Sequence, residues 1–138
     1  MDASVVAKWF NRGEEYEREA IALRKAWVGD KMELVAPSHL PFEVANSIWK
    51  NPNIRPRHVG TLVRLMVRIS PRLKDLSEEV AVKAMSLARR RSLTFYDASY
   101  LALARFLACP LVTADREQLE AAVRYATAMH LSSFGKIR

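Results

Sequence analysis

Four acidic residues stand at the predicted starts of four helices, and they are the first sign of chemistry in this sequence. They are Asp2, Glu43, Asp97 and Asp115. Taken singly, each acid has a structural explanation, because a carboxylate near a helix N-terminus stabilises the helix by about 0.3–1 kcal/mol. Asp97 follows Thr94 by three residues, and this spacing fits a capping box. Asp115 precedes Gln118 by three residues and fits the same pattern.

Taken together, the four acids predict a metal site. In a parallel α/β sheet, helices begin at the carboxyl ends of strands, and ligands bind at that edge. Asp115 directly follows the apolar stretch LVTA, and Glu43 follows MELVAP. Carboxylates that converge without basic partners repel one another, whereas Mg²⁺ or Mn²⁺ prefers such oxygen ligands. A bound ion of this kind suits the hydrolysis of phosphodiester bonds.

Asp97 lies at the start of a helix, expected from 94 to 108, that is apolar on nearly all sides. A helix of this composition is expected to be buried. A carboxylate at its start is costly to bury unless it is paired or bound to a metal. The setting of Asp97 therefore favours a site over a simple cap.

The chain is basic, with a formal net charge of +7, and a basic protein of this size tends to associate with polyanions. Arg57, Arg64 and Arg68 are spaced by seven and four residues, so they share one face of a predicted helix. We expect this face to contact RNA phosphates near the scissile bond. The alternative is a solvated helix face.

The elements that must position these residues alternate between helices and short apolar strands. Helices are expected at 4–12, 14–27, 38–50, 57–69, 77–91, 94–108 and 115–126, and strands at 32–37, 111–114 and 129–134, with a weaker one at 72–76. This order predicts the α/β class with a central parallel sheet. With 138 residues, half of them hydrophobic, residues 1–138 are expected to form a single domain.

Composition also bears on the compartment. No apolar run reaches the roughly 18 residues that a membrane span needs, and charged residues interrupt any signal-peptide pattern at the N-terminus. The single cysteine, Cys109, cannot form an internal disulfide and is expected to be a packed thiol. These features predict a cytoplasmic protein with no membrane partner.

Four stretches in this order and spacing, MDASVVAKWF, PFEVANSIWK, LTFYDASYLALA and LVTADREQLE, resemble the PIN-domain family, most of all its small prokaryotic VapC-type toxins. The resemblance covers essentially the whole chain. It implies a parallel sheet of about five strands flanked by helices. It also implies endoribonuclease activity that depends on Mg²⁺ or Mn²⁺, and a cognate antitoxin that blocks the site.

The resemblance assigns roles to individual residues. It matches Asp2, Glu43, Asp97 and Asp115 to the acidic quartet of the family. Thr113 matches a hydroxyl two positions before the last acid, and Ser4 and Asn46 match polar positions that support the metal ligands. Asn46 lies three residues after Glu43, so both project from the same side of a helix.

The chain departs from the family at its N-terminus, where only Met1 precedes Asp2. Either the true start lies upstream, or most of the first strand is absent. We therefore expect four to five strands, the first of them truncated. Two functions stay open: a toxin ribonuclease with an intact metal site, or a non-catalytic PIN-like module that binds RNA or protein. A phosphoacceptor receiver-like domain fits less well, since it needs an acidic pair after the first strand and a lysine after a late strand.

The chain also carries many large apolar side chains on its predicted helices. Those least easily placed inside one small domain are Trp9, Phe10, Trp27, Trp49, Leu65 and Val67. Exposed apolar patches larger than a few hundred Å² usually mark interfaces. We expect a homodimer, with a second core layer as the alternative.

Overall fold

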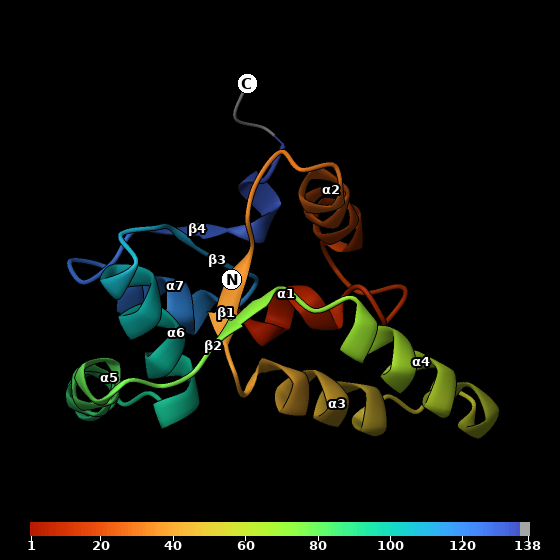
Figure 1. Ribbon diagram of the computed structural model, residues 1–138, viewed down its shortest axis with the longest axis horizontal. Helices are drawn as coiled ribbons and strands as arrows, with labels where there is room; N and C mark the ends of the chain where they lie inside the picture. Colours follow the sequence, from red (N-terminus) through yellow and green to blue (C-terminus); the bar gives the residue numbers. More distant parts are fainter. Residues whose placement is uncertain (136–138) are drawn as a thin grey trace.

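A computed structural model describes residues 1–135 and shows helices packed around short strands (Figure 1). The helices are α1 (Ala3–Ala7), α2 (Glu17–Val28), α3 (Leu40–Lys50), α4 (Pro56–Arg68), α5 (Glu78–Arg91), α6 (Phe95–Phe106) and α7 (Arg116–Ala122). The strands are β1 (Val35–Pro37), β2 (Arg72–Lys74), β3 (Leu111–Thr113) and β4 (Ala128–His130), and a 3₁₀ turn, η1 (Leu131–Ser133), follows β4. The predicted α/β class is confirmed.

The strands form two parallel pairs. In the first pair β1 lies beside β2, with Val35 opposite Arg72, and in the second β3 lies beside β4, with Leu111 opposite Ala128. Helices connect the strands within each pair, as parallel pairing requires. Within residues 1–135 the strands therefore do not form the single sheet of four to five strands that we expected.

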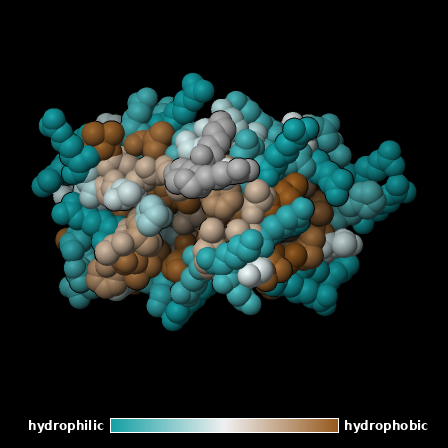
Figure 2. Space-filling model, turned by 90° about the horizontal axis from the view of Figure 1, so that it is seen from above, coloured by the Kyte–Doolittle hydropathy of each residue, from teal (hydrophilic) through white to brown (hydrophobic). Residues whose placement is uncertain are grey.

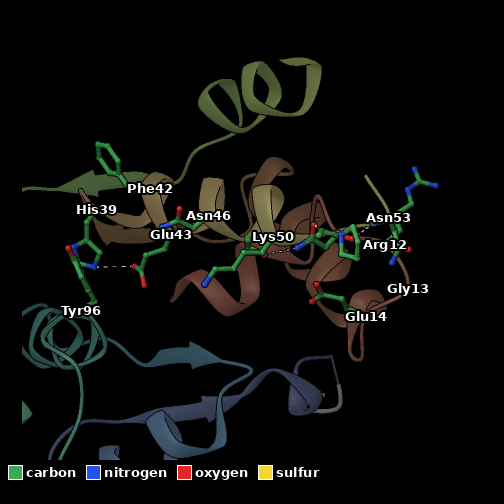
Figure 3. A pocket seen from close by; sticks show the side chains of 14 residues that line it. Arg12, Gly13, Glu14, His39, Phe42, Glu43, Asn46, Lys50, Asn53 and Tyr96 are labelled. Carbon is green, nitrogen blue, oxygen red and sulfur yellow. Dashed lines mark hydrogen bonds and ion pairs between the residues drawn. The ribbon is translucent and has the colours of Figure 1, made fainter. Parts of the chain in front are cut away.

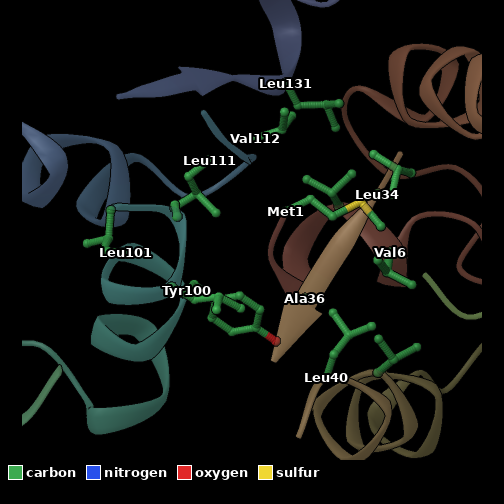
Figure 4. Close-up of a cluster of buried hydrophobic side chains, with 14 of the residues drawn as sticks. Met1, Val6, Leu34, Ala36, Leu40, Tyr100, Leu101, Leu111, Val112 and Leu131 are labelled. Carbon is green, nitrogen blue, oxygen red and sulfur yellow. The ribbon is translucent and has the colours of Figure 1, made fainter. Parts of the chain in front are cut away.

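The first two residues of the chain link the two pairs. The amino group of Met1 donates a hydrogen bond to the carbonyl oxygen of Val35 in β1, over 3.0 Å. The backbone N–H of Asp2 donates to the carbonyl oxygen of Val112 in β3, over 3.2 Å. Figure 4 shows the Met1 side chain lying between Leu34 and Val112. Met1 and Asp2 thus occupy the position of a strand between β1 and β3, although no strand forms there.

The core surrounds these strands (Figure 4). Helix α6 contributes seven consecutive buried residues, Ala98–Ala104, which confirms the prediction that this helix is buried. Val6 from α1 and Leu40 from α3 pack on the other side of β1. Because α6 is enclosed, its N-terminal turn, which carries Asp97, is held in a fixed position beside the strands.

Two predicted helix lengths are wrong. The helix expected at 4–12 ends at Ala7, because the N–H groups of Trp9 and Phe10 turn back to carbonyls three residues earlier. The turn buries Trp9, which stacks on Trp27 at 5.8 Å between ring centroids and donates its indole N–H to the carbonyl oxygen of Ala20. The helix expected at 115–126 ends at Ala122. Trp9 and Phe10 therefore belong to the core and not to the surface.

Helix α4 is the most exposed of the long helices, since Met66 is its single buried residue. Val63, three residues before Met66, is 37% exposed. Arg57, Arg64 and Arg68 are all exposed, as their spacing predicted.

Several other apolar side chains face outward. Trp49 on α3 is 77% exposed and Val67 on α4 is 66% exposed. On the face shown in Figure 2, apolar atoms gather in patches bordered by hydrophilic side chains. Over residues 1–135, no helix combines the length and the hydropathy that crossing a bilayer would require.

Candidate active site

The carboxylate of Asp2 is buried at the junction of α1, β1 and β3. It caps α1, because Oδ1 accepts a hydrogen bond from the backbone N–H of Val5 over 3.3 Å. Oδ1 also accepts from the hydroxyl of Ser4 over 2.5 Å, and Oδ2 accepts from the hydroxyl of Thr113. Burial raises the pKa of Asp2, and these hydrogen bonds act against the rise.

Thr113, at the end of β3, connects Asp2 with Asp115. Its hydroxyl oxygen accepts from the backbone N–H of Asp115 over 2.9 Å while its proton goes to Asp2. Ser4 makes a parallel link, since its oxygen accepts from the N–H of Ala114 over 2.9 Å. The predicted partners Ser4 and Thr113 therefore both touch Asp2, and they hold the turn before α7 against the start of α1.

Asp115 caps α7, because its Oδ1 accepts from the N–H groups of Glu117 and Gln118 over 2.8 and 3.3 Å. The reciprocal half of the expected capping box is absent from the described hydrogen bonds. The side chain of Gln118 instead donates to the backbone carbonyl of Asp97 over 3.4 Å. Gln118 thus ties the start of α7 to the start of α6.

Asp97 makes only one half of its expected capping box, because its carboxylate accepts no described hydrogen bond from the backbone N–H of Thr94. Its backbone N–H donates to the hydroxyl oxygen of Thr94 over 3.1 Å, and that hydroxyl donates to Oδ2 of Asp97 over 2.5 Å. One oxygen of this carboxylate is thus engaged locally.

Glu43 has two neighbours that the sequence did not single out. The phenol of Tyr100 donates to Oε2 over 2.6 Å, and Nε2 of His39 lies 3.3 Å from the same oxygen. His39 also lies 3.3 Å from the hydroxyl of Ser99 and packs against the ring of Tyr96. Glu43 is therefore held against the N-terminal turns of α6.

Charge and burial act together on this group. Burial raises the pKa of Glu43, and the nearby charges of Asp97 and Asp2 raise it further. Burial lowers the pKa of His39, which keeps the imidazole neutral. Burial and the hydrogen bond to Glu43 raise the pKa of Tyr100, so its phenol stays protonated and remains a donor.

The four acids, here called the acidic group, lack a lysine or arginine partner in the part of the chain that the structure describes. Among residues 1–135, no lysine or arginine forms an ion pair with Asp2, Glu43, Asp97 or Asp115. As these side chains stand, the described residues also contain no set of three or more His, Cys, Asp or Glu arranged to hold one metal ion. Carboxylate oxygens are suitable ligands for a hard divalent cation. That all four carboxylates bind the same ion stays a prediction.

A groove of about 1080 Å³ opens beside Glu43 (Figure 3). Glu43, His39 and Tyr96 lie at one end, and Lys50 lies between them and the far end. Asn46 lines the groove and is exposed, and it makes none of the described side-chain hydrogen bonds to the acids. The role expected for Asn46 beside a metal ligand stays a prediction.

The far end of the groove is built from amides. Buried Asn11 donates to the hydroxyl of Ser47 over 2.7 Å and accepts from the side chain of Asn51 over 3.0 Å. The side chain of Asn51 in turn accepts from the backbone N–H of Asn53 over 2.9 Å. Arg12 and Asn53 stand at this end (Figure 3). Glu14, which is paired with Lys8, also lies at this end, so the groove runs from Glu43 to an end that carries amides and both signs of charge.

Comparison with known proteins shows the family of the chain. The family model described as PIN domain matches residues 1–124. The chain is 31% identical over 124 residues to "Ribonuclease VapC3" of Pyrobaculum aerophilum, which covers 87% of this chain and 91% of that protein. It is 29% identical over 93 residues to "Exonuclease VapC9" of the same organism, covering 67% of this chain and 70% of that protein.

A solved structure shows the same fold. The crystal structure of PAE2754 from Pyrobaculum aerophilum superposes with a TM-score of 0.64 at 23% sequence identity, covering 96% of this chain and 89% of that one. The family match extends from the acid at the start of α1 to beyond the acid that caps α7, so it includes every element that carries a predicted site residue. The chain belongs to the PIN-domain family.

Proposed function

We propose that the protein is a ribonuclease that depends on Mg²⁺ or Mn²⁺ and cleaves RNA at phosphodiester bonds. The observation that carries the proposal is the environment of Glu43, which lines one end of a large groove and is repelled by the nearby charges of Asp97 and Asp2, without a lysine or arginine partner among the described residues. Such repulsion is relieved when a divalent cation binds. The matched relative named as a ribonuclease supports RNA as the substrate.

Asp2, Glu43, Asp97 and Asp115 would hold the metal. When bound, the ion would lower the pKa of a bound water and neutralise charge on the phosphate. The chain's own residues orient the ligands. Ser4 and Thr113 fix the Asp2 carboxylate by hydrogen bonds to both of its oxygens, and Tyr100 and His39 fix Glu43.

The groove would hold the RNA strand. Lys50 and Arg12 supply positive charge along it, and the amides of Asn46 and Asn53 offer donors and acceptors to base edges. Tyr96 is 56% exposed at the Glu43 end and presents an aromatic face on which a base could stack. We infer a single-stranded substrate, because an aromatic ring and side-chain amides can contact bases only when those bases are unpaired.

We infer cleavage within the strand, although one matched relative is named as an exonuclease. A circular single-stranded RNA separates the two activities, since it has no ends. The wild-type protein with Mn²⁺ should open the circle, and a linear RNA of the same sequence should give internal fragments. Trimming of the linear RNA with an intact circle would assign the exonuclease activity instead.

The matched variant for this assay is Asp97→Asn. It keeps an acceptor for the Thr94 hydroxyl, so the fold should persist and the metal-free protein should be as stable as the wild type or slightly more stable. Its RNA cleavage should fall to background. Full activity of this variant in Mn²⁺ would refute the role of Asp97. RNA binding by the wild type without cleavage in any divalent metal would favour the non-catalytic module.

The proposed setting is that of a cytoplasmic toxin with a cognate antitoxin that blocks the groove. The names of the two relatives as VapC proteins support this pairing. We also propose a homodimer, supported by the outward-facing Trp49 and Val67 on neighbouring helices.

A further inference from the structure

A second pocket lies away from the acidic site, between α5, the C-terminal half of α6 and the segment after α7. Its volume is about 410 Å³, within the range of about 300–1,000 Å³ that is usual for small-ligand sites. Five of its lining residues are cationic: Lys83, Arg90, Arg91, Arg105 and Arg124. No acidic residue of the described chain lines it. None of the four predicted metal ligands lines it either.

Two of the guanidinium groups are held in place by the backbone. Arg91 donates to the carbonyl oxygen of Val123 over 3.2 Å, and Arg105 donates to that of Tyr125 over 3.3 Å. Arg105 also stacks over the ring of Tyr125, with 4.8 Å between its Cζ and the ring centroid. A guanidinium has five N–H donors, so one bond to a carbonyl orients the group and leaves donors for a ligand.

Two other cations in the pocket have no polar partner in the described chain. Arg90 and Arg124 form no ion pair or side-chain hydrogen bond within residues 1–135, whereas Lys83 pairs with Glu79 over 2.5 Å. Arg124 has a backbone φ of 61°, a left-handed conformation that is costly for a residue with a Cβ. Such strained residues cluster at functional sites.

A neutral donor lies beside these charges. The hydroxyl of Tyr125, which also lines the pocket, is shielded from solvent and has no hydrogen-bond partner among the described residues. Buried polar groups are normally paired, and a bound acceptor would relieve this one. The preferred ligand is therefore an anion rich in acceptor oxygens.

We propose that this pocket binds a phosphate group. Oriented guanidinium groups match the oxygens of phosphate in pairs, and lysine adds a point charge. The phosphate could belong to the backbone of an RNA strand or to a small phosphorylated compound, and both present the same chemistry. Asp97 and Arg105 are eight residues apart on α6, so the pocket lies about 12 Å along the helix axis from the start that carries the acid.

The test compares a pocket variant with a control that loses equal charge. The pocket variant is Arg90→Ala with Arg124→Ala, two side chains with no described contacts to lose. The control is Arg18→Ala with Lys25→Ala, which removes two exposed cations from α2. The protein is kept in EDTA, so that phosphate cannot act through a metal at the acidic site and the result does not depend on nuclease activity.

Inorganic phosphate is the first probe, with sodium chloride of equal ionic strength as the reference. Phosphate should raise the thermal unfolding temperature of wild type and control in a saturable way, by linkage. The pocket variant should need at least about tenfold more phosphate, because two charge-assisted contacts are lost. The proposal would be overturned if phosphate did not raise the unfolding temperature of the wild type, or if it raised that of the pocket variant and the control equally.

A short single-stranded RNA, measured by fluorescence anisotropy in EDTA, identifies the source of the phosphate. If the pocket variant binds RNA more weakly than the control, the RNA backbone occupies the pocket. If RNA affinities are equal while phosphate binding is lost, a small phosphorylated compound is the ligand. Either result supports the phosphate pocket, provided that the pocket variant has already shown weaker binding of inorganic phosphate than the control.

Discussion

At the scale of single residues, one hydroxyl connects two of the four acids. Thr113 is fully buried, donates to Asp2 and accepts from the N–H of Asp115. Valine has the same shape but lacks the hydroxyl, so a Thr113→Val variant would leave a buried carboxylate oxygen and a backbone N–H without partners. Groups left unsatisfied in this way each cost about 1–3 kcal/mol.

We therefore expect Thr113→Val to unfold at clearly lower urea concentration than the wild type. Thr113→Ser is the matched control, because it keeps the hydroxyl and loses only a methyl group. If the valine variant is as stable as the wild type while the serine variant is destabilised, the methyl group and not the hydroxyl bridge carries the stability.

The repulsion on Glu43 gives a prediction about pH. Its pKa is raised in the folded state by burial and by the charges of Asp97 and Asp2. A carboxyl with a raised folded pKa stabilises the protein most below its unfolded pKa, and this contribution is lost as pH rises through the folded pKa. Without metal, the stability of Glu43→Gln relative to the wild type should therefore rise between about pH 4 and about pH 7.

Urea unfolding in EDTA at the two pH values measures this difference. Glu120→Gln is the control, because that side chain is exposed on α7 and makes no ion pair within residues 1–135. A Glu43→Gln difference that is the same at both pH values would show that the neighbouring carboxylates do not repel Glu43 in solution.

The sequence predicted part of the site at this scale. The resemblance singled out Ser4 and Thr113, but it matched Thr113 to Asp115, and only the structure shows its hydroxyl donating to Asp2. His39 and Tyr100 were not singled out, since their contacts with Glu43 depend on how α3 meets α6. A signal was present in hindsight: His39 lies four residues before Glu43, and Tyr100 three residues after Asp97, so each shares a helix face with an acid.

At the scale of elements, α4 carries a testable surface. Arg57, Arg64 and Arg68 lie on its exposed side, while Met66 packs inward against the neighbouring helix. If this face contacts RNA phosphates, Arg64→Ala with Arg68→Ala should weaken RNA binding for all sequences. The dependence of log K on log salt should flatten by about one to two units, one for each lost contact.

The measurement is a salt titration of RNA affinity, with the exposed pair Arg18→Ala and Lys25→Ala on α2 as a control for net charge. Metal binding should be unaffected, because exposed charges beyond about 10 Å are screened. If the slope of log K against log salt changes equally in both variants, the arginine face of α4 is only solvated and does not contact RNA.

The sequence predicted the elements better than their assembly. Hydrophobic periodicity placed all seven helices, and β2 was found despite its weak signal. The ends of α1 and α7 were missed, because tertiary contacts such as the Trp9–Trp27 stack decide where those helices stop. The link between the two strand pairs depends on single backbone hydrogen bonds of Met1 and Asp2, which no side-chain pattern encodes.

At the scale of the whole molecule, charge is unevenly distributed. The formal net charge is +7, yet the acidic group beside the groove lacks a lysine or arginine partner in the described chain. Positive charge is concentrated on α4 and around the pocket between α5 and α6. An RNA strand would be attracted to the surface as a whole but would need a cation to approach the carboxylates. The carboxylates would thus hold the metal ion, while the groove and the cationic surfaces would bind the strand.

The apolar surface is the other whole-molecule feature, and its pattern sharpens the prediction of a homodimer. Trp9 and Phe10 turned out to be buried, which leaves Trp49 on α3 and Val67 on α4 among the most exposed apolar side chains. We expect light scattering at micromolar concentration to give twice the chain mass of 15.7 kDa. The variant Trp49→Glu should reduce it to the monomer mass, because an interface core does not tolerate an unpaired charge. Phe106→Glu, at the exposed end of α6, is the control and should stay dimeric. A monomeric wild type would count against the dimer, and dissociation by Phe106→Glu alone would place the interface on the opposite side of the molecule.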